Sequence, residues 1–240
     1  MAMQEHIVAS FDEDLNSLSQ KIAEMGGLAE QNVADSVAAL VNRDAEKAQR
    51  VIASDERIDR LQRELEESAV LLIARRQPMA RDLREIVAAI HIAIELERVG
   101  DLAKNTAKRV LAIESNFGSQ RLVAGVEHMA ELCLTQLKDV LDALASRDLT
   151  SARAVWERDN EVDAMYTSLF RELLTYMMED PRNITFCTHL LFCAKNIERI
   201  GDHATNISEN LHYLVTGNPL TDERPKQDTT STTSVPYKEA

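Results

Sequence analysis

One apolar pattern, repeated at a nearly fixed interval, constrains the fold of this 240-residue chain more than any other feature of its sequence. From Phe11 to Leu40, apolar residues recur every three or four positions, which is the spacing of one face of an α-helix. The pattern returns 104 positions further on, where Met129 matches Met25 and Leu144 matches Leu40. Matches at a fixed offset indicate that the chain contains two copies of one unit.

Each copy of the unit is predicted to hold three long helices. In the first copy, Asp44 is the N-cap of a second helix, and Pro78 stops the apolar stripe of that helix. A third helix is predicted from about Asp82 to Ile113. Beyond the second helix the offset falls to 101, so the loop before the third helix is shorter in the second copy. Helices of about 30 residues are about 45 Å long, which suits an elongated antiparallel bundle with short loops.

We therefore expect an all-α fold of two tandem antiparallel three-helix bundles, with six long helices. The chain has only 7 Gly and 5 Pro, so few residues interrupt helices. The predicted ranges are 1–115 for the first bundle, 116–120 for a linker and 121–215 for the second bundle. From 216 to 240 the composition shifts to Gly, Asn, Pro, Asp, Thr and Ser with almost no large apolar residue, which predicts a disordered tail.

The charge of the chain narrows the range of partners. With 27 Lys and Arg against 40 Asp and Glu, the formal net charge is -13. This charge argues against nucleic acid as a partner, because nucleic acid affinity rests on basic residues. An acidic surface suits metal cations or basic protein partners, although solubility is the commonest reason for a negative net charge.

The cysteines and the hydropathy of the chain indicate a cytoplasmic protein. Cys133, Cys187 and Cys193 are odd in number, are never spaced as C-x-x-C and lie among apolar residues, so we expect reduced core thiols. No apolar run approaches the ~18 residues of a membrane-spanning helix, and residues 1–10 lack the pattern of a signal peptide. Any membrane association is therefore expected to be peripheral and to occur only through partners.

Pairs of acidic residues interrupt the apolar stripes at matching places in both copies. Asp55 follows Val51 by four residues on the second helix, and Asp59 follows one turn later. This spacing stacks both carboxylates on one face of the helix, with Cβ atoms ~6 Å apart, and such like charges weaken a helix. Four pairs share the spacing, and an asparagine follows two of them: Asp55 and Asp59, Glu97 and Asp101 with Asn105, Asp159 and Asp163, and Glu198 and Asp202 with Asn206.

The recurrence of these pairs predicts a compensating cation. If the second and third helices pack in register, Asp55 and Asp59 face Glu97 and Asp101, and protons or a metal must relieve the repulsion. A hard divalent or trivalent cation is satisfied by carboxylates and by the amide oxygens of the two asparagines. The alternative is that the acids face water or pair with nearby arginines. Those arginines are Arg57, Arg98, Arg158 and Arg199.

Each third helix carries the same motif around a glycine. The motif reads Glu-Arg-Val-Gly-Asp at 97–101 and Glu-Arg-Ile-Gly-Asp at 198–202. A glycine inside a helix costs about 1 kcal/mol against alanine. Close approach of a neighbouring helix is therefore the predicted compensation at Gly100 and Gly201.

The paired motif, with Asn105 after the first and His-Ala-Thr-Asn at 203–206 after the second, closely resembles the PhoU family over residues 7–215. The resemblance implies two three-helix bundles, frequent dimerisation and a role as accessory to the phosphate-specific ABC transporter. In some members the acidic motifs hold iron or zinc clusters. Carried over residue by residue, these ligands are Asp55, Asp59, Glu97, Asp101, Asp159, Asp163, Glu198 and Asp202. The identity of the metal does not transfer, so Mg, Mn, Zn and Fe all stay open.

The function that the resemblance implies is negative control of phosphate uptake and of the phosphate-starvation two-component response. The resemblance implies contact with the nucleotide-binding subunit of the transporter and with a phosphate-sensing histidine kinase, and it implies a homodimer. We expect no catalytic turnover, because no nucleophile with a base and no phosphate-cradling glycine loop is found. Two alternatives stay open: a purely structural helical adaptor, and a dimetal bundle enzyme, whose Glu-x-x-His motif is met only by Glu209 and His212.

Overall fold

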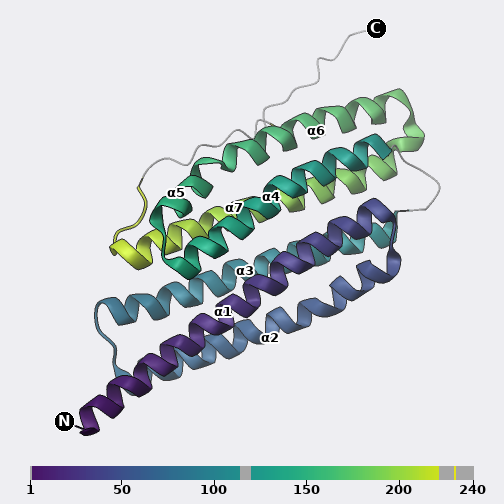
Figure 1. Ribbon diagram of the computed structural model, residues 1–240. Coiled ribbons are helices and arrows are strands. Elements are labelled where there is room, and N and C mark those ends of the chain that lie inside the picture. Colours follow the sequence, from purple (N-terminus) through teal and green to yellow (C-terminus); the bar gives the residue numbers. More distant parts are fainter. Residues whose placement is uncertain (1, 114–119, 222–229, 231–240) are drawn as a thin grey trace.

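Helices are the only regular elements among the residues that the structure, a computed structural model, describes, which are 2–113, 120–221 and 230 (Figure 1). The first repeat forms α1 (Ala2–Asn42), α2 (Ala45–Arg76) and α3 (Arg81–Ala112). The second repeat forms α4 (Gln120–Ser146), α5 (Leu149–Glu157), α6 (Asp159–Glu179), the short 3-10 helix η1 (Pro181–Asn183) and α7 (Ile184–Thr216). The predicted all-α fold is confirmed.

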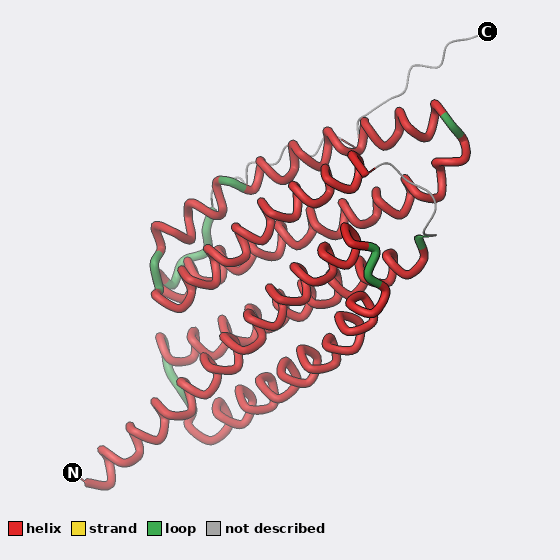
Figure 2. The backbone as a smooth tube through the Cα atoms, turned by 45° about the vertical axis from the view of Figure 1, so that its right-hand side comes forward, coloured by secondary structure: helices red, strands yellow, loops and turns green. Residues whose placement is uncertain are grey.

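The two bundles lie side by side with their long axes aligned (Figures 1 and 2). Helices α1, α2 and α3 pack on one another, and α7 packs against α4, α5 and α6. The bundles meet where α3 lies against α7 and, less extensively, where α1 lies against α4. The third helix of each repeat, which carries the glycine motif, therefore lies at the centre of the molecule.

Equivalent caps begin the second helix of each repeat. Asp44 and Asp148 have extended backbones, and each side chain accepts a hydrogen bond from a backbone N–H of the first turn. The residues before them, Arg43 and Arg147, have φ values of 54° and 55°, in the left-handed region. The duplication therefore extends to the backbone of the turn, and the predicted N-cap at Asp44 is confirmed.

One apolar core runs through both bundles. Met25 and Met129, which match across the repeat, are both fully buried. The three cysteines are buried and free, as the sequence predicts. The apolar stripes thus provide the face on which each helix packs, and acidic residues that interrupt them are drawn towards the interior.

The second helix of the second repeat differs from the prediction, because it is divided at Arg158 into α5 and α6. Arg158 has φ −87° and ψ 0°, and its N–H donates to the carbonyls of Ala154 and Val155. Gln136 of α4 donates its Nε2 to the Arg158 carbonyl at 2.9 Å. The break directly precedes Asp159, so it sets the start of the helix that carries two of the predicted site residues.

The predicted linker and tail fall mostly outside the described residues. Of the linker, only Gln120 is described, and it begins α4. Thr216, which the prediction assigned to the tail, is the last residue of α7, and Gly217 caps the helix with φ 79°. The domain ranges stay predictions. Within the described ranges, no helix combines the length and apolarity needed to cross a bilayer.

Candidate functional site

Four carboxylates meet between α2 and α3, and we call Asp55, Asp59, Glu97 and Asp101 the first acid cluster. Asp55 is only 2% exposed, although aspartate side chains are rarely buried so completely unless they are paired. Burial raises the pKa of Asp55, against the hydrogen bond from a lysine, and the charges of Asp59 and Asp101 add to the rise. Burial likewise raises the pKa of Glu97, followed by the charge of Asp101. The helices therefore bring the predicted residues close enough to repel one another.

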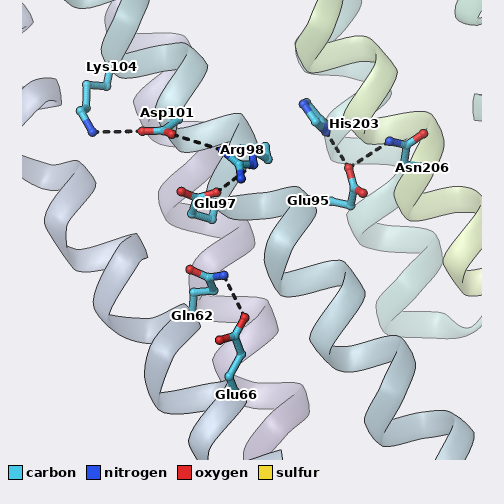
Figure 3. Close-up of polar contacts among 9 residues, drawn as sticks. All are labelled: Gln62, Glu66, Glu95, Glu97, Arg98, Asp101, Lys104, His203 and Asn206. Carbon is cyan, nitrogen blue, oxygen red and sulfur yellow. Dashed lines mark hydrogen bonds and ion pairs between the residues drawn. The ribbon is translucent and has the colours of Figure 1, made fainter.

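Lys104 of α3 connects the two helices of the first acid cluster. Its Nζ donates to Asp55 Oδ2 at 2.5 Å. It also donates to Asp101 Oδ1 at 3.0 Å (Figure 3). These hydrogen bonds raise the pKa of Lys104, led by the one to Asp55, so the ammonium stays charged. Sequence reasoning missed Lys104. Its signal was the Asp-x-x-Lys spacing, which places the lysine one turn after Asp101.

The arginines contribute unevenly to charge compensation. Exposed Arg98 lies 3.4 Å from Glu97 Oε2 and 3.9 Å from Asp101 Oδ2 (Figure 3). Arg57 instead pairs with Glu24, and Arg158 pairs with Asp139, so both of these ion pairs lie outside the acid clusters. Pairing with arginines is therefore observed at Arg98, where its exposure limits what it contributes.

The glycines of the two motifs allow the helices to approach. A Cβ on Gly100 would lie 2.9 Å from Ile58 Cδ1 and 3.3 Å from Asp55 Oδ1, so α3 lies close enough to α2 that these side chains would have to shift. A Cβ on Gly201 would have ordinary contacts, the nearest at 3.5 Å from Gln136 Oε1. The predicted close approach is confirmed at Gly100 and is looser at Gly201.

The second acid cluster consists of Asp159 and Asp163 on α6 with Glu198 and Asp202 on α7. The first three of these are 2%, 3% and 5% exposed, and Asp202 is half-buried. Burial raises the pKa of Glu198, and the charges of Asp202 and Asp163 add to it, against a lysine hydrogen bond. The predicted carboxylates of the second repeat are therefore also gathered between its second and third helices.

The cations and hydroxyls of the second acid cluster do not copy those of the first. Lys195 Nζ donates to Glu198 Oε1 at 2.9 Å and lies 4.9 Å from the ring centroid of Tyr166. Thr205 Oγ1 donates to Asp159 Oδ1 at 3.2 Å. The duplication has thus conserved the acids but not the side chains that balance them.

The two predicted asparagines lie differently from the acids. Asn206 Nδ2 donates to Glu95 Oε2 at 3.0 Å, and His203 Nδ1 lies 2.6 Å from the same oxygen (Figure 3). Because Glu95 is on α3, this contact joins the two bundles. Burial alone would raise the pKa of Glu95, but the hydrogen bonds from His203 and Asn206 outweigh it and hold the pKa low. Asn105 is exposed on α3.

The donor atoms of both clusters fit a hard cation in their chemistry. Asp55 Oδ1, Glu198 Oε2 and Gln136 Oε1 are buried and have no hydrogen-bond partner. All three are oxygens that only accept, which is the ligand type that Mg²⁺, Mn²⁺ and Ca²⁺ prefer. In the described part of the chain, however, no three His, Cys, Asp or Glu side chains are already arranged around one metal position. The carboxylates would have to move for a metal to bind.

Gln136 was not among the predicted residues, and the repeat offers the signal that could have found it. Asn32 occupies the matching position 104 residues earlier, and both amides are buried, at 4% and 2% exposed. Glu209, the acid of the Glu-x-x-His alternative, accepts a hydrogen bond from Trp156 Nε1 at 3.0 Å. This carboxylate therefore binds the indole of Trp156.

Comparison with known proteins gives consistent matches along most of the chain. The family model described as PhoU domain matches residues 22–110 and 126–211. A protein of Rhizobium meliloti is 63% identical over 227 residues, covering 95% of this chain and 96% of its own. A Caulobacter vibrioides protein is 54% identical over 229 residues, covering 95% and 100%. Both are named phosphate-specific transport system accessory protein PhoU homolog.

Two solved structures share the fold of this chain. The crystal structure of PhoU from Pseudomonas aeruginosa has a TM-score of 0.84 and 39% identity, covering 87% of this chain and 100% of its own. The structure named as the phosphate transport system regulatory protein PhoU from Streptococcus pneumoniae has a TM-score of 0.81 and 30% identity, with 88% and 99% covered.

Proposed function

The chain belongs to the PhoU family, and on this premise we propose that it is an accessory protein of phosphate transport that restrains phosphate uptake and the phosphate-starvation response. The observation that carries the proposal is the 63% identity, over 95% of the chain, to a relative named as an accessory protein of the phosphate-specific transport system. The word regulatory in the name of the Streptococcus pneumoniae relative supports the second part of the proposal, that the protein restrains phosphate uptake and the phosphate-starvation response. These names describe an accessory protein and no enzyme, and we propose no catalytic turnover.

The proposed partners are the nucleotide-binding subunit of the phosphate ABC transporter and a phosphate-sensing histidine kinase, both met in the cytoplasm by a homodimer. Exposed methionines at the two ends of the molecule support contacts of this kind. Met79, in the loop between α2 and α3, is 80% exposed, and Met178, near the end of α6, is 72% exposed. Methionine adapts its shape to apolar partners, which suits a protein with more than one partner.

We also propose that each acid cluster binds a metal ion. The buried acceptors Asp55 Oδ1 and Glu198 Oε2 support it, because each lies among carboxylates and lacks a donor. The first acid cluster and the second acid cluster would hold the metal through carboxylate oxygens. When bound, the metal would supply the positive charge that each set of acids lacks. Asn206 donates its Nδ2 to Glu95, and this hydrogen bond does not use its amide oxygen.

Deletion of the gene tests the regulatory part of the proposal. In a deletion strain grown with abundant phosphate, we expect alkaline phosphatase to be expressed, and we expect the wild-type gene in trans to repress it again. A strain that keeps the enzyme repressed after deletion would contradict negative control. Capture of the tagged protein from phosphate-replete membranes, with crosslinking, serves as the partner assay for the transporter subunit and the kinase.

A further inference from the structure

A lysine ammonium lies inside each acid cluster. In the first acid cluster, Lys104 bridges Asp55 of α2 and Asp101 of α3 at 2.5 Å and 3.0 Å. In the second, Lys195 lies 2.9 Å from Glu198, which is 5% exposed. Each lysine therefore compensates a carboxylate that the fold has taken out of water, where an uncompensated charge is costly.

The two lysines do not descend from one position of the repeated unit. With the offset of 101 between the third helices, Thr205 stands where Lys104 would be expected, and Ile94 stands where Lys195 would be expected. The acids match across the repeat, but the lysine follows the glycine motif in α3 and precedes it in α7. The same charge compensation has thus been reached twice by different residues, which indicates that the clusters require it.

Neither lysine satisfies its cluster completely. Asp55 Oδ1 and Glu198 Oε2 stay buried without a hydrogen-bond donor, although the other oxygen of each carboxylate is bonded to the lysine. Gln136, which is 2% exposed, adds a third buried acceptor, Oε1, beside Gly201 of the second acid cluster. Unused acceptors next to an ammonium indicate sites that a cation with more coordination positions would fill better.

We propose that Lys104 and Lys195 are tethered counter-ions that hold the acid clusters together in the metal-free protein and move out when a metal ion takes their carboxylates. The proposal rests on the metal binding proposed above, and it adds that metal and lysine compete for the same oxygens. The side chains of Lys104 and Lys195 are 24% and 38% exposed, so each ammonium has a path into solvent on its flexible stem.

Competition of this kind has two opposite consequences for a lysine variant. Without metal, loss of the ammonium leaves the carboxylates uncompensated and lowers stability. With metal, the same loss removes the form of the site in which the ammonium occupies the carboxylates and prevents the metal from binding. If the lysine occupies its cluster in ~90% or more of the molecules, removing it raises metal affinity by about tenfold or more. If the lysine had a purely structural role, removing it would lower both the stability of the metal-free protein and its affinity for metal.

The test compares lysine variants with matched charge controls in the full-length protein. Lys104→Met and Lys195→Met remove the two ammonium groups, while Lys108→Met on α3 and Lys138→Met on α4 remove one exposed positive charge from the same bundles. Mn²⁺ binding is followed by the loss of the free-ion electron paramagnetic resonance signal. The melting temperature is measured in EDTA and again with Mn²⁺. Lys104→Gln, which keeps a hydrogen-bond donor, serves if Lys104→Met does not fold.

We expect Lys104→Met and Lys195→Met to melt at lower temperature than their controls in EDTA, and to bind Mn²⁺ about tenfold or more tightly than their controls. Equal Mn²⁺ affinity in the lysine variants and the controls would overturn the exchange and leave metal binding intact. Absence of tight Mn²⁺ binding from the wild type and from all variants would overturn the metal part of the proposed function and, with it, the exchange. The two failures are therefore distinguishable.

Discussion

Alanine at Gly100 and alanine at Gly201 are expected to change the stability of the protein in opposite directions, although the two glycines are equivalent in the repeat. In a helix, alanine is more stable than glycine by about 1 kcal/mol where space permits. At Gly201 the new Cβ would have contacts of 3.5 Å or more. At Gly100 it would lie 2.9 Å from Cδ1 of Ile58, so that fully buried side chain would have to shift.

The magnitude follows from these distances. Overpacking of a buried contact costs about 1–3 kcal/mol, and the middle of this range exceeds the gain of about 1 kcal/mol in helix propensity. We therefore expect Gly100→Ala to lose about 1 kcal/mol and Gly201→Ala to gain about 1 kcal/mol. For a chain of this length, each kcal/mol shifts the melting temperature by about 2–4 °C, so the two variants should melt about 4–8 °C apart. Thermal unfolding in EDTA, followed by far-ultraviolet circular dichroism, measures the difference.

Ile58→Val provides the control, because it deletes the Cδ1 atom that the new Cβ would meet. In the wild type, this substitution should cost about 1 kcal/mol through the cavity it leaves. In the Gly100→Ala background it should cost less or stabilise, giving a coupling energy of about 1 kcal/mol between the two sites. Additive effects of Gly100→Ala and Ile58→Val, or equal shifts for the two alanine variants, would refute the reasoning from contact distances.

Two further predictions concern single acids. Glu95→Ala should destabilise the protein by about 2 kcal/mol, because His203 and Asn206 lose their shared acceptor, whereas Glu95→Gln should lose less; equal melting temperatures for the wild type and Glu95→Ala would contradict this. The pKa of Glu95 is held low, so its contribution is present at neutral pH and is lost as the pH falls through the folded-state value. The pKa of Glu198 is raised, so protonation as the pH falls towards the usual glutamate range should relieve a cost in the wild type. In EDTA, Glu198→Gln should lack this rise in stability, because glutamine takes up no proton. A Glu198→Gln variant whose melting temperature depends on pH as that of the wild type does would contradict the prediction.

The helices and the facing acids could be predicted because they rest on local spacing. A period of three or four residues predicts which face of a helix is buried, and Met25 and Met129 are buried as their matching positions require. Asp55 and Glu97 were expected to face each other for the same reason, since each interrupts the stripe of a helix. Their raised pKa values, led by burial, agree with that placement.

Two features that depend on particular partners from other helices could not be predicted. Nothing in the apolar period marks Arg158 as a break, since the backbone leaves the helix where Gln136 of α4 bonds to its carbonyl. Glu95 shows no local signal either, because its partners His203 and Asn206 are more than 100 positions away and belong to the other bundle. Such contacts follow from the packing of α3 on α7, which helix periodicity does not specify.

The duplication itself explains why the polar side chains are harder to predict than the fold. Both copies must bury the same apolar faces, so the stripes, caps and acids match across the repeat. The central contact of α3 with α7 places different residues at equivalent positions: Glu95 corresponds to Asn196, which donates to Thr106 of α3 at 3.3 Å. Lys104 likewise corresponds to Thr205, so the two acid clusters have equal acids but different balancing groups. A measurement on one cluster therefore does not give the affinity of the other, and each must be tested with its own lysine.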